Sequence, residues 1–177
     1  MIKPFSKSYT KEQLELFEFL LKNKLFSELT LKELSEFLPH LYLRTYQQNE
    51  VIFFRNDPSQ ALYLIKTGMV ALKIDVNDSF ETFAHIHPTA SVGNNALLNK
   101  TKRVYNAIVE SESAQLYVIP QVNILSIFDS NVKIRAKLYA SLAEIYNSNT
   151  TNLMKAYQAT SGFFDLEQMY KNLEHGG

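Results

Sequence analysis

A run of short strand-like segments between two helical stretches is the feature that most restricts the fold of this chain. Between residues 41 and 119, β-branched and aromatic residues gather in short runs separated by turn-forming residues. Residues 61–65 are apolar throughout, which is typical of a buried strand, and apolar and polar residues alternate over 70–76. Several short strands at this spacing predict an antiparallel barrel or jelly roll.

Helical periodicity flanks the strands on both sides. Thr10 and Thr30 each open a capping-box sequence, in which the threonine and a Gln or Glu three residues later satisfy free N–H groups. We expect a helix after each, the second ending before Pro39. Beyond the strands, the pattern predicts a short helix over 122–128 and then one of about 28 residues, capped by residues 129–130.

A chain of 177 residues suits one compact domain with an appendage, and an apolar content of 46% is enough for a sizeable core. We divide it into an N-terminal helical segment (1–40), a β-roll (41–119), and C-terminal helices with a short tail (120–177). The long helix is predicted to form a homodimer, with Asn149 interrupting its apolar seam. A helix that lies back on its own barrel is the alternative.

Composition excludes several classes of function. The chain has no cysteine, so disulfides, thiol nucleophiles and cysteine metal sites are ruled out. Its formal net charge of +0 argues against strong overall attraction to nucleic acid or to anionic membranes. The N-terminus lacks an apolar signal core and no apolar run approaches membrane-span length, so we expect a soluble cytoplasmic protein.

A turn around Gly93 carries the candidate chemistry. Glycine lets the backbone bend there into a short helical turn, whose first N–H groups, from Asn94 to Ala96, can hold an anion such as phosphate. Lys100, Lys102 and Arg103 follow and can close over the same anion. A plain polar connection between two strands is the alternative.

Four segments then occur in a recognisable order. They are residues 25–30 (LFSELT), 49–57 (NEVIFFRND), 62–70 (LYLIKTGMV) and 92–98 (VGNNALL). Together they resemble the cyclic-nucleotide-binding domain of the catabolite activator family of bacterial regulators, with residues 92–98 at the phosphate-binding cassette. The resemblance implies a mainly β fold with flanking helices: an antiparallel, jelly-roll-type β-roll (a double-stranded β-helix) with N-terminal helices and a long C-terminal helix.

The resemblance also implies site residues, with departures from the family pattern. The family's cassette glutamate, which holds the ribose 2′-hydroxyl, is replaced by Asn94. Its phosphate-binding arginine, usually in "R-S/T-A", falls on Val104 when counted back from residues 116–119 and on Arg103 when counted forward from Gly93. The register with Val104 in the pocket, which turns Arg103 to solvent, is the one we favour. The implied phosphate-site residues are Gly93, Asn94, Asn95, Ala96, Arg103, Val104 and Tyr105.

Asn149 and Thr150 fall where the family's long helix contacts the purine. The ligand implied is a cyclic nucleotide, cyclic AMP or cyclic GMP, and no other cofactor is expected. About twenty residues follow Tyr157, too few for the family's helix-turn-helix reader, so we expect no DNA binding by this chain.

Three functions follow, in order of preference. The first is a non-catalytic regulatory domain that senses a cyclic nucleotide or a related phosphate ligand and signals through its C-terminal helix to a protein partner. The second is a degenerate, ligand-free dimerisation or docking domain. The third is a cupin-like metal enzyme, because His85 and His87 share one face of a strand, although no carboxylate follows them at cupin spacing.

Overall fold

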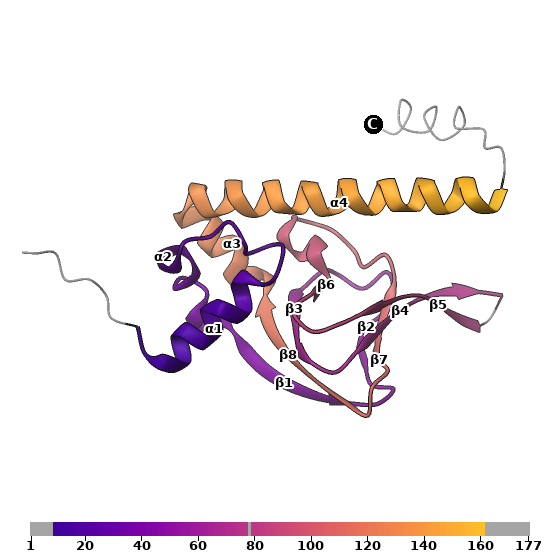
Figure 1. Cartoon of the computed structure of the whole chain (residues 1–177), viewed down its shortest axis with the longest axis horizontal. Coiled ribbons are helices and arrows are strands. Elements are labelled where there is room, and N and C mark those ends of the chain that lie inside the picture. Colours follow the sequence, from indigo (N-terminus) through magenta and orange to yellow (C-terminus); the bar gives the residue numbers. More distant parts are fainter. Residues whose placement is uncertain (1–8, 78, 162–177) are drawn as a thin grey trace, which may run out of the picture. The chain divides into compact units, whose positions relative to one another are not determined.

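The computed structural model describes residues 9–77 and 79–161, except the side chains of residues 160 and 161. The described chain forms two four-stranded antiparallel sheets with helices before and after them (Figure 1). The strands are β1 (Tyr42–Gln47), β2 (Val51–Phe53), β3 (Ala61–Thr67), β4 (Val70–Val76), β5 (Ser79–Ile86), β6 (Ser91–Val92), β7 (Asn106–Val109) and β8 (Ser113–Pro120). The helices are α1 (Lys11–Leu21), α2 (Leu31–Leu34), α3 (Gln121–Ser130) and α4 (Val132–Ser161), with 3₁₀ turns η1 (Leu38–His40) and η2 (Asn94–Leu97).

The strand order explains why the two sheets form a roll. One sheet runs β1-β8-β3-β6 and the other β2-β7-β4-β5, so the chain repeatedly crosses between them. Their inner faces meet around a core of alternate strand residues, as expected for antiparallel sheets with one buried face. This core consists of Phe53, Ile65, Val70, Leu72, Val92, Ala107, Val109, Ala114 and Leu116. The predicted mainly β fold with flanking helices is confirmed.

The N-terminal helices begin where the capping boxes predict. Thr10 accepts a hydrogen bond from the Gln13 N–H, and Thr30 accepts one from the Glu33 N–H. The second helix is shorter than expected, because α2 ends at Leu34 and Pro39 lies inside the separate turn η1.

At the other end of the roll, α3 and α4 follow β8 directly. The helix α4 spans 30 residues, close to the predicted length. Its cap is not residues 129–130, which end α3, but Asn131, whose Oδ1 accepts from the Ile134 N–H at 3.3 Å. The short tail predicted beyond residue 161 lies outside the described residues.

The chain divides into two compact units, the first ending at Leu142 and the second beginning at Ala143. In the first unit, α4 buries Ile134, Leu138 and Leu142, four residues apart on one face. In the second unit, α4 carries exposed Tyr146 and Leu153. The domain boundaries predicted from the sequence remain a prediction.

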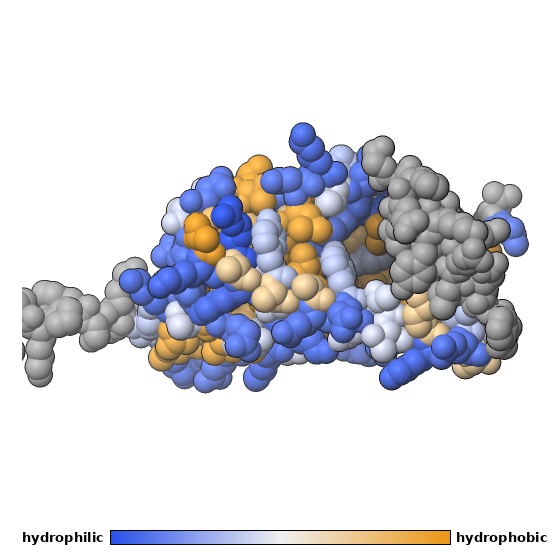
Figure 2. Space-filling view, turned by 90° about the horizontal axis from the view of Figure 1, so that it is seen from above, coloured by the Kyte–Doolittle hydropathy of each residue, from blue (hydrophilic) through white to orange (hydrophobic). Residues whose placement is uncertain are grey.

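The described surface mixes residues of both kinds. In Figure 2, hydrophobic residues lie in separate groups between hydrophilic ones. None of the described helices is both long and apolar enough to cross a membrane.

Candidate functional site

Gly93 shapes the turn between β6 and η2. Its backbone is left-handed, with φ +76° and ψ 33°, a conformation in which glycine avoids the usual steric cost. A Cβ atom at this position would overlap the guanidinium of Arg103 and lie 3.2 Å from the Ala61 carbonyl oxygen. The glycine therefore supplies both the bend and the space for an arginine side chain.

Arg103 fills that space. It is only 3% exposed, and its side chain donates hydrogen bonds both to the cassette (residues 92–98) and to β3. Nη1 donates to the Gly93 carbonyl at 3.0 Å and to Asn95 Oδ1 at 3.2 Å, while Nη2 donates to the Ala61 carbonyl at 2.6 Å. The guanidinium thus joins the start of β3 to the start of η2.

Aromatic rings line the same place. The guanidinium carbon lies 4.2 Å from the ring centre of Phe53 and 5.7 Å from that of Tyr63. Tyr105 packs against Phe53 at 5.8 Å between ring centres and also contacts Phe83. Cation–π contacts of this kind stabilise a buried charge by about 1–2 kcal/mol.

Burial also shifts the pKa values of these groups. Burial lowers the pKa of Arg103, and nearby Tyr63, Tyr105 and Asp57 oppose that shift. Burial raises the pKa of the Tyr63 and Tyr105 phenols. Since an arginine keeps its proton in proteins, the centre of the site is a desolvated cation among neutral phenols.

This cation has spare hydrogen-bonding capacity. Three of its five N–H donors make the bonds above, and Nε is buried without a partner among the described residues. Arg103 also has no ion-pair partner in this part of the chain. In η2, the buried Oδ1 of Asn94 also lacks a hydrogen-bond partner among the described residues. The turn around Gly93 therefore contains one unpaired buried donor, Arg103 Nε, and one unpaired buried acceptor, Asn94 Oδ1.

The structure decides the register that the sequence left open. Arg103 points into the roll and the side chain of Val104 is 68% exposed. The favoured register, with Val104 inward and Arg103 in solvent, is therefore wrong. Tyr105 returns to the inside, and its hydroxyl makes a long contact of 3.5 Å with the Gly93 N–H.

Other predicted site residues have mixed positions. The Ala96 N–H already donates to the Gly93 carbonyl, so it is not free to hold an anion as expected. Asn95 spans the loop, since its amide donates to the Lys102 carbonyl. Lys100 and Lys102 are exposed and do not share the burial of Arg103. Only one of the three predicted cations is therefore built into the turn.

The two residues of the long helix that are predicted to contact the purine are solvent-exposed. Asn149 and Thr150 lie on α4 within the second compact unit. Their proposed role in ligand binding remains a prediction.

The histidines of the metal hypothesis are arranged differently from a metal site. His85 Nε2 lies 2.7 Å from Glu110 Oε2, and both side chains are partly exposed. Residues 9–77 and 79–161 contain no cluster of three or more His, Asp or Glu side chains able to hold a metal ion. The cupin hypothesis gains no support from the structure.

Sequence reasoning missed several residues of this site. Phe53 and Tyr63 form its aromatic wall, and Gln121 binds the far end of η2. The two rings lie in the segments 49–57 and 62–70 that carried the resemblance, so strand alternation was the signal for their inward direction. Gln121 had no comparable signal, because a glutamine at a helix start is ordinary.

Comparison with known proteins agrees with the β-roll fold. The solved structures similar to this chain include the regulatory domain of Toxoplasma gondii PKA with cAMP, at 17% identity and a TM-score of 0.62, covering 72% of this chain and 49% of that one. They also include the sensor domain of the Pseudomonas aeruginosa transcriptional regulator DNR, at 17% identity and 0.65, covering 80% and 95%. Both show the fold alone, and this chain spans about half the length of the Toxoplasma chain.

The Thermus thermophilus catabolite activator protein is 27% identical, with a TM-score of 0.62, over 75% of this chain and 62% of that one. No curated protein matches this chain. The family model described as "Cyclic nucleotide-binding domain" matches residues 43–131, which are 89 of the 177 residues. On this match and the β-roll, the chain belongs to the cyclic nucleotide-binding domain family.

Proposed function

We propose that this protein is a non-catalytic regulatory domain that binds a cyclic nucleotide, or a related phosphate ligand, at the turn around Gly93. Domains of this family are regulatory and generally non-enzymatic. Ligand binding would bias the position of the C-terminal helices and so signal to a partner, since a ligand shifts an equilibrium only through differential affinity.

The observation that carries the proposal is the buried, unpaired charge of Arg103. A buried cation without an anion is costly, and a bound anion would offset that cost. Its free donors match a phosphate oxygen, which arginine binds through short charge-assisted hydrogen bonds. A monoanionic phosphodiester would neutralise the charge without adding another.

Asn94 supports a second contact. Its unpaired Oδ1 can accept a hydrogen bond from a ligand hydroxyl next to the phosphate. A neutral amide accepts less strongly than the glutamate that the family resemblance places here. We infer that a sugar hydroxyl would be held more weakly than in relatives that carry the carboxylate.

Two structural neighbours have cyclic AMP in their names: the Toxoplasma gondii regulatory domain and "cAMP bound PfPKA-R". This makes cyclic AMP the first ligand to test, with cyclic GMP beside it. We further propose a cytoplasmic homodimer formed through α4 that acts on a protein partner and does not bind DNA.

A ligand-free docking domain is the second candidate. It is favoured by the three acceptors of the chain itself, Gly93, Asn95 and Ala61, which already hold the guanidinium. In this case the arginine would be a structural clamp that replaces a lost ligand.

Calorimetric titration with cyclic AMP and cyclic GMP separates the two candidates. We expect binding to the native protein, and a loss of about 10- to 100-fold in affinity for Arg103→Met, as when a charged hydrogen bond of about 1.5–3 kcal/mol is removed. Lys102→Met is the matched control, since it removes an adjacent but exposed cation and should leave the affinity nearly unchanged. The absence of heat with either nucleotide at millimolar concentration would overturn binding of these two cyclic nucleotides and favour the docking domain.

A further inference from the structure

The turn η2 is bound at both of its ends. At its start, Arg103 donates to the Gly93 carbonyl and to Asn95 Oδ1. At its end, the side chain of Gln121 donates from Nε2 to the Ala96 carbonyl at 3.0 Å and to the Leu98 carbonyl at 2.8 Å. One amide group thus binds two carbonyls at the end of this short helical turn, of which that of Leu98 also accepts a long bond from the Thr101 hydroxyl.

Gln121 is the first residue of α3. A second route also joins it to Arg103, because the Gln121 N–H donates to the Gln60 carbonyl at 2.7 Å. The next residue, Ala61, accepts from Arg103 Nη2. Two short paths, one through η2 and one through residues 60–61, therefore connect the guanidinium to the start of α3.

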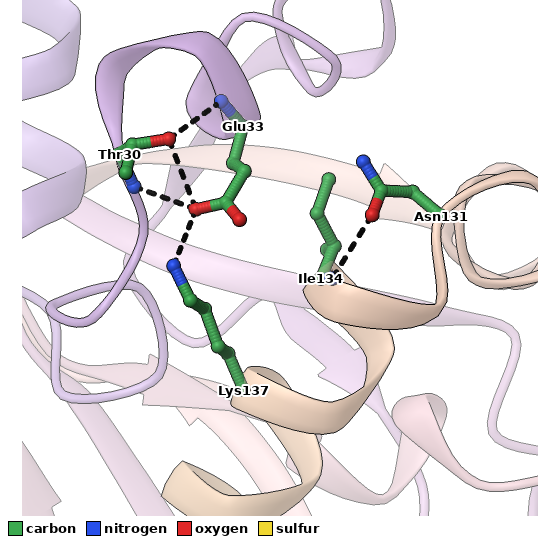
Figure 3. A network of polar contacts seen from close by, with 5 residues as sticks. All are labelled: Thr30, Glu33, Asn131, Ile134 and Lys137. Atoms are coloured by element: carbon green, nitrogen blue, oxygen red, sulfur yellow. Dashed lines mark hydrogen bonds and ion pairs between the residues drawn. The ribbon is translucent and has the colours of Figure 1, made fainter.

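The helix α3 is well placed to pass a displacement on. Its residues Ile124, Ile127 and Phe128 are buried, so it moves as a packed unit. It leads through Asn131, which caps the first turn of α4 by accepting from the Ile134 N–H (Figure 3). Asn131 thus connects the end of α3 to the first turn of α4, and a shift of α3 would act on the beginning of α4.

The beginning of α4 is in turn fastened to the N-terminal helices. Lys137 Nζ lies 2.7 Å from Glu33 Oε2, which also accepts from the N–H and the hydroxyl of Thr30 (Figure 3). A displacement of α3 that moved the start of α4 would also change the distance between Lys137 and Glu33. The N-terminal helices would then be affected as well.

We propose that Gln121 is the positioning residue that couples the state of Arg103 to α3. The role deepens the proposed function and rests on it, since a ligand that engages Arg103 would alter the bonds to Gly93 and Asn95. The turn η2 would then shift as a unit, because Ala96 and Leu97 are fully buried. The side chain of Gln121 would carry this shift to α3, and without it only the backbone path through Gln60 and Ala61 would remain.

The coupling can be tested without any ligand. Amide hydrogen exchange is measured over residues 121–130 in four proteins: native, Arg103→Met, Gln121→Met and the double variant. We expect Arg103→Met to speed exchange in α3 at least threefold in the native background. In the Gln121→Met background it should add less than half of that effect, because the side-chain path through η2 is removed and only the backbone path through Gln60 and Ala61 remains.

The controls separate coupling from loss of structure. Asn123→Leu removes an amide from the same helix that has no hydrogen bond among those described, and the Arg103→Met effect should persist in its background. Asn95→Ala is a milder change at the cassette that removes one acceptor of Nη1 together with the bond to the Lys102 carbonyl, and it should reproduce the response at reduced size if Arg103→Met does not fold. Equal effects of the cassette variants with and without Gln121 would overturn the proposal.

Repeating the exchange experiment with cyclic AMP as the probe separates the two claims. If the native protein does not bind it, the proposed function fails for this ligand while the ligand-free result still decides the coupling. If it binds, the change of exchange in α3 at saturating cyclic AMP should be smaller by at least half in Gln121→Met than in the native protein. Binding with an unchanged α3 response in that variant would overturn the role of Gln121.

Discussion

The turn around Gly93 and the outer part of α4 are both predicted to hold polar groups toward one ligand, yet they differ in what fixes those groups. At the turn, Arg103 is buried and bound by three acceptors. On the helix, Asn149 and Thr150 are exposed. A buried charge must be satisfied by its surroundings, whereas an exposed polar residue is satisfied by water and constrains nothing. The turn is therefore evidence about function, and the helix pair is only compatible with it.

The largest expected effect comes from Gly93→Ala. The left-handed backbone and the overlap with Arg103 together should lower the free energy of unfolding by about 2–5 kcal/mol. Chemical denaturation measures this change. Combining the substitution with Arg103→Ala should restore part of the loss by removing the overlap, while the cost of the positive φ remains. A fully additive double variant would show that the two residues are not in contact.

Asn94→Glu tests whether the turn around Gly93 contacts a sugar hydroxyl of the ligand. A carboxylate would supply a stronger acceptor for a sugar hydroxyl and should raise the affinity for cyclic AMP by about 10-fold or more, as charged hydrogen bonds are worth about 1.5–3 kcal/mol. Calorimetry with cyclic AMP and its 2′-deoxy analogue provides the test. The gain should be confined to the nucleotide that carries the hydroxyl, and an equal gain for both would assign the effect to general electrostatics.

The same contrast explains how much the sequence could predict. The roll followed from the period of apolar residues, because burying one sheet face requires alternation. The direction of Arg103 did not follow, since counts from Gly93 and from β8 differ by one residue. Between them the backbone includes Lys100 at φ +57° and an isolated bridge from Pro58 to Lys102. Such irregular backbone changes which residues point into the roll, and the residue types in this segment do not predict it.

Helix lengths show a similar limit. The capping box at Thr30 was correctly located, but α2 closes after Leu34 instead of continuing to Pro39. Phe26 and Phe37 meet edge to face with their ring centres 5.2 Å apart, a tertiary contact that a continuous helix would not automatically provide. A local signal fixes where such a helix begins, whereas packing decides where it ends.

Glu33→Gln tests the ion pair with Lys137, which attaches the packed first part of α4 to the N-terminal helices. Burial alone would raise the pKa of Glu33, but hydrogen bonds from Lys137 and Thr30 outweigh it and lower the pKa. The carboxylate therefore stabilises the fold above the pKa of an unfolded glutamate, and this contribution is lost as pH falls through the folded pKa. We expect a loss of about 1 kcal/mol at neutral pH, because Lys137 remains partly exposed. Thermal unfolding as a function of pH should show the native and variant proteins converging in acid.

The smallest effects are expected from Asn149→Ala and Thr150→Ala. Both side chains are exposed, so each substitution should change the free energy of unfolding by less than about 0.5 kcal/mol. If the long helix contacts the purine, each should nevertheless weaken cyclic AMP binding about three- to tenfold, the value of one neutral hydrogen bond. Ser148→Ala, an exposed neighbour outside the predicted pair, is the matched control. Unchanged affinity in all three variants would confine recognition to the roll, and the cassette alone would then have to account for any preference between cyclic AMP and cyclic GMP.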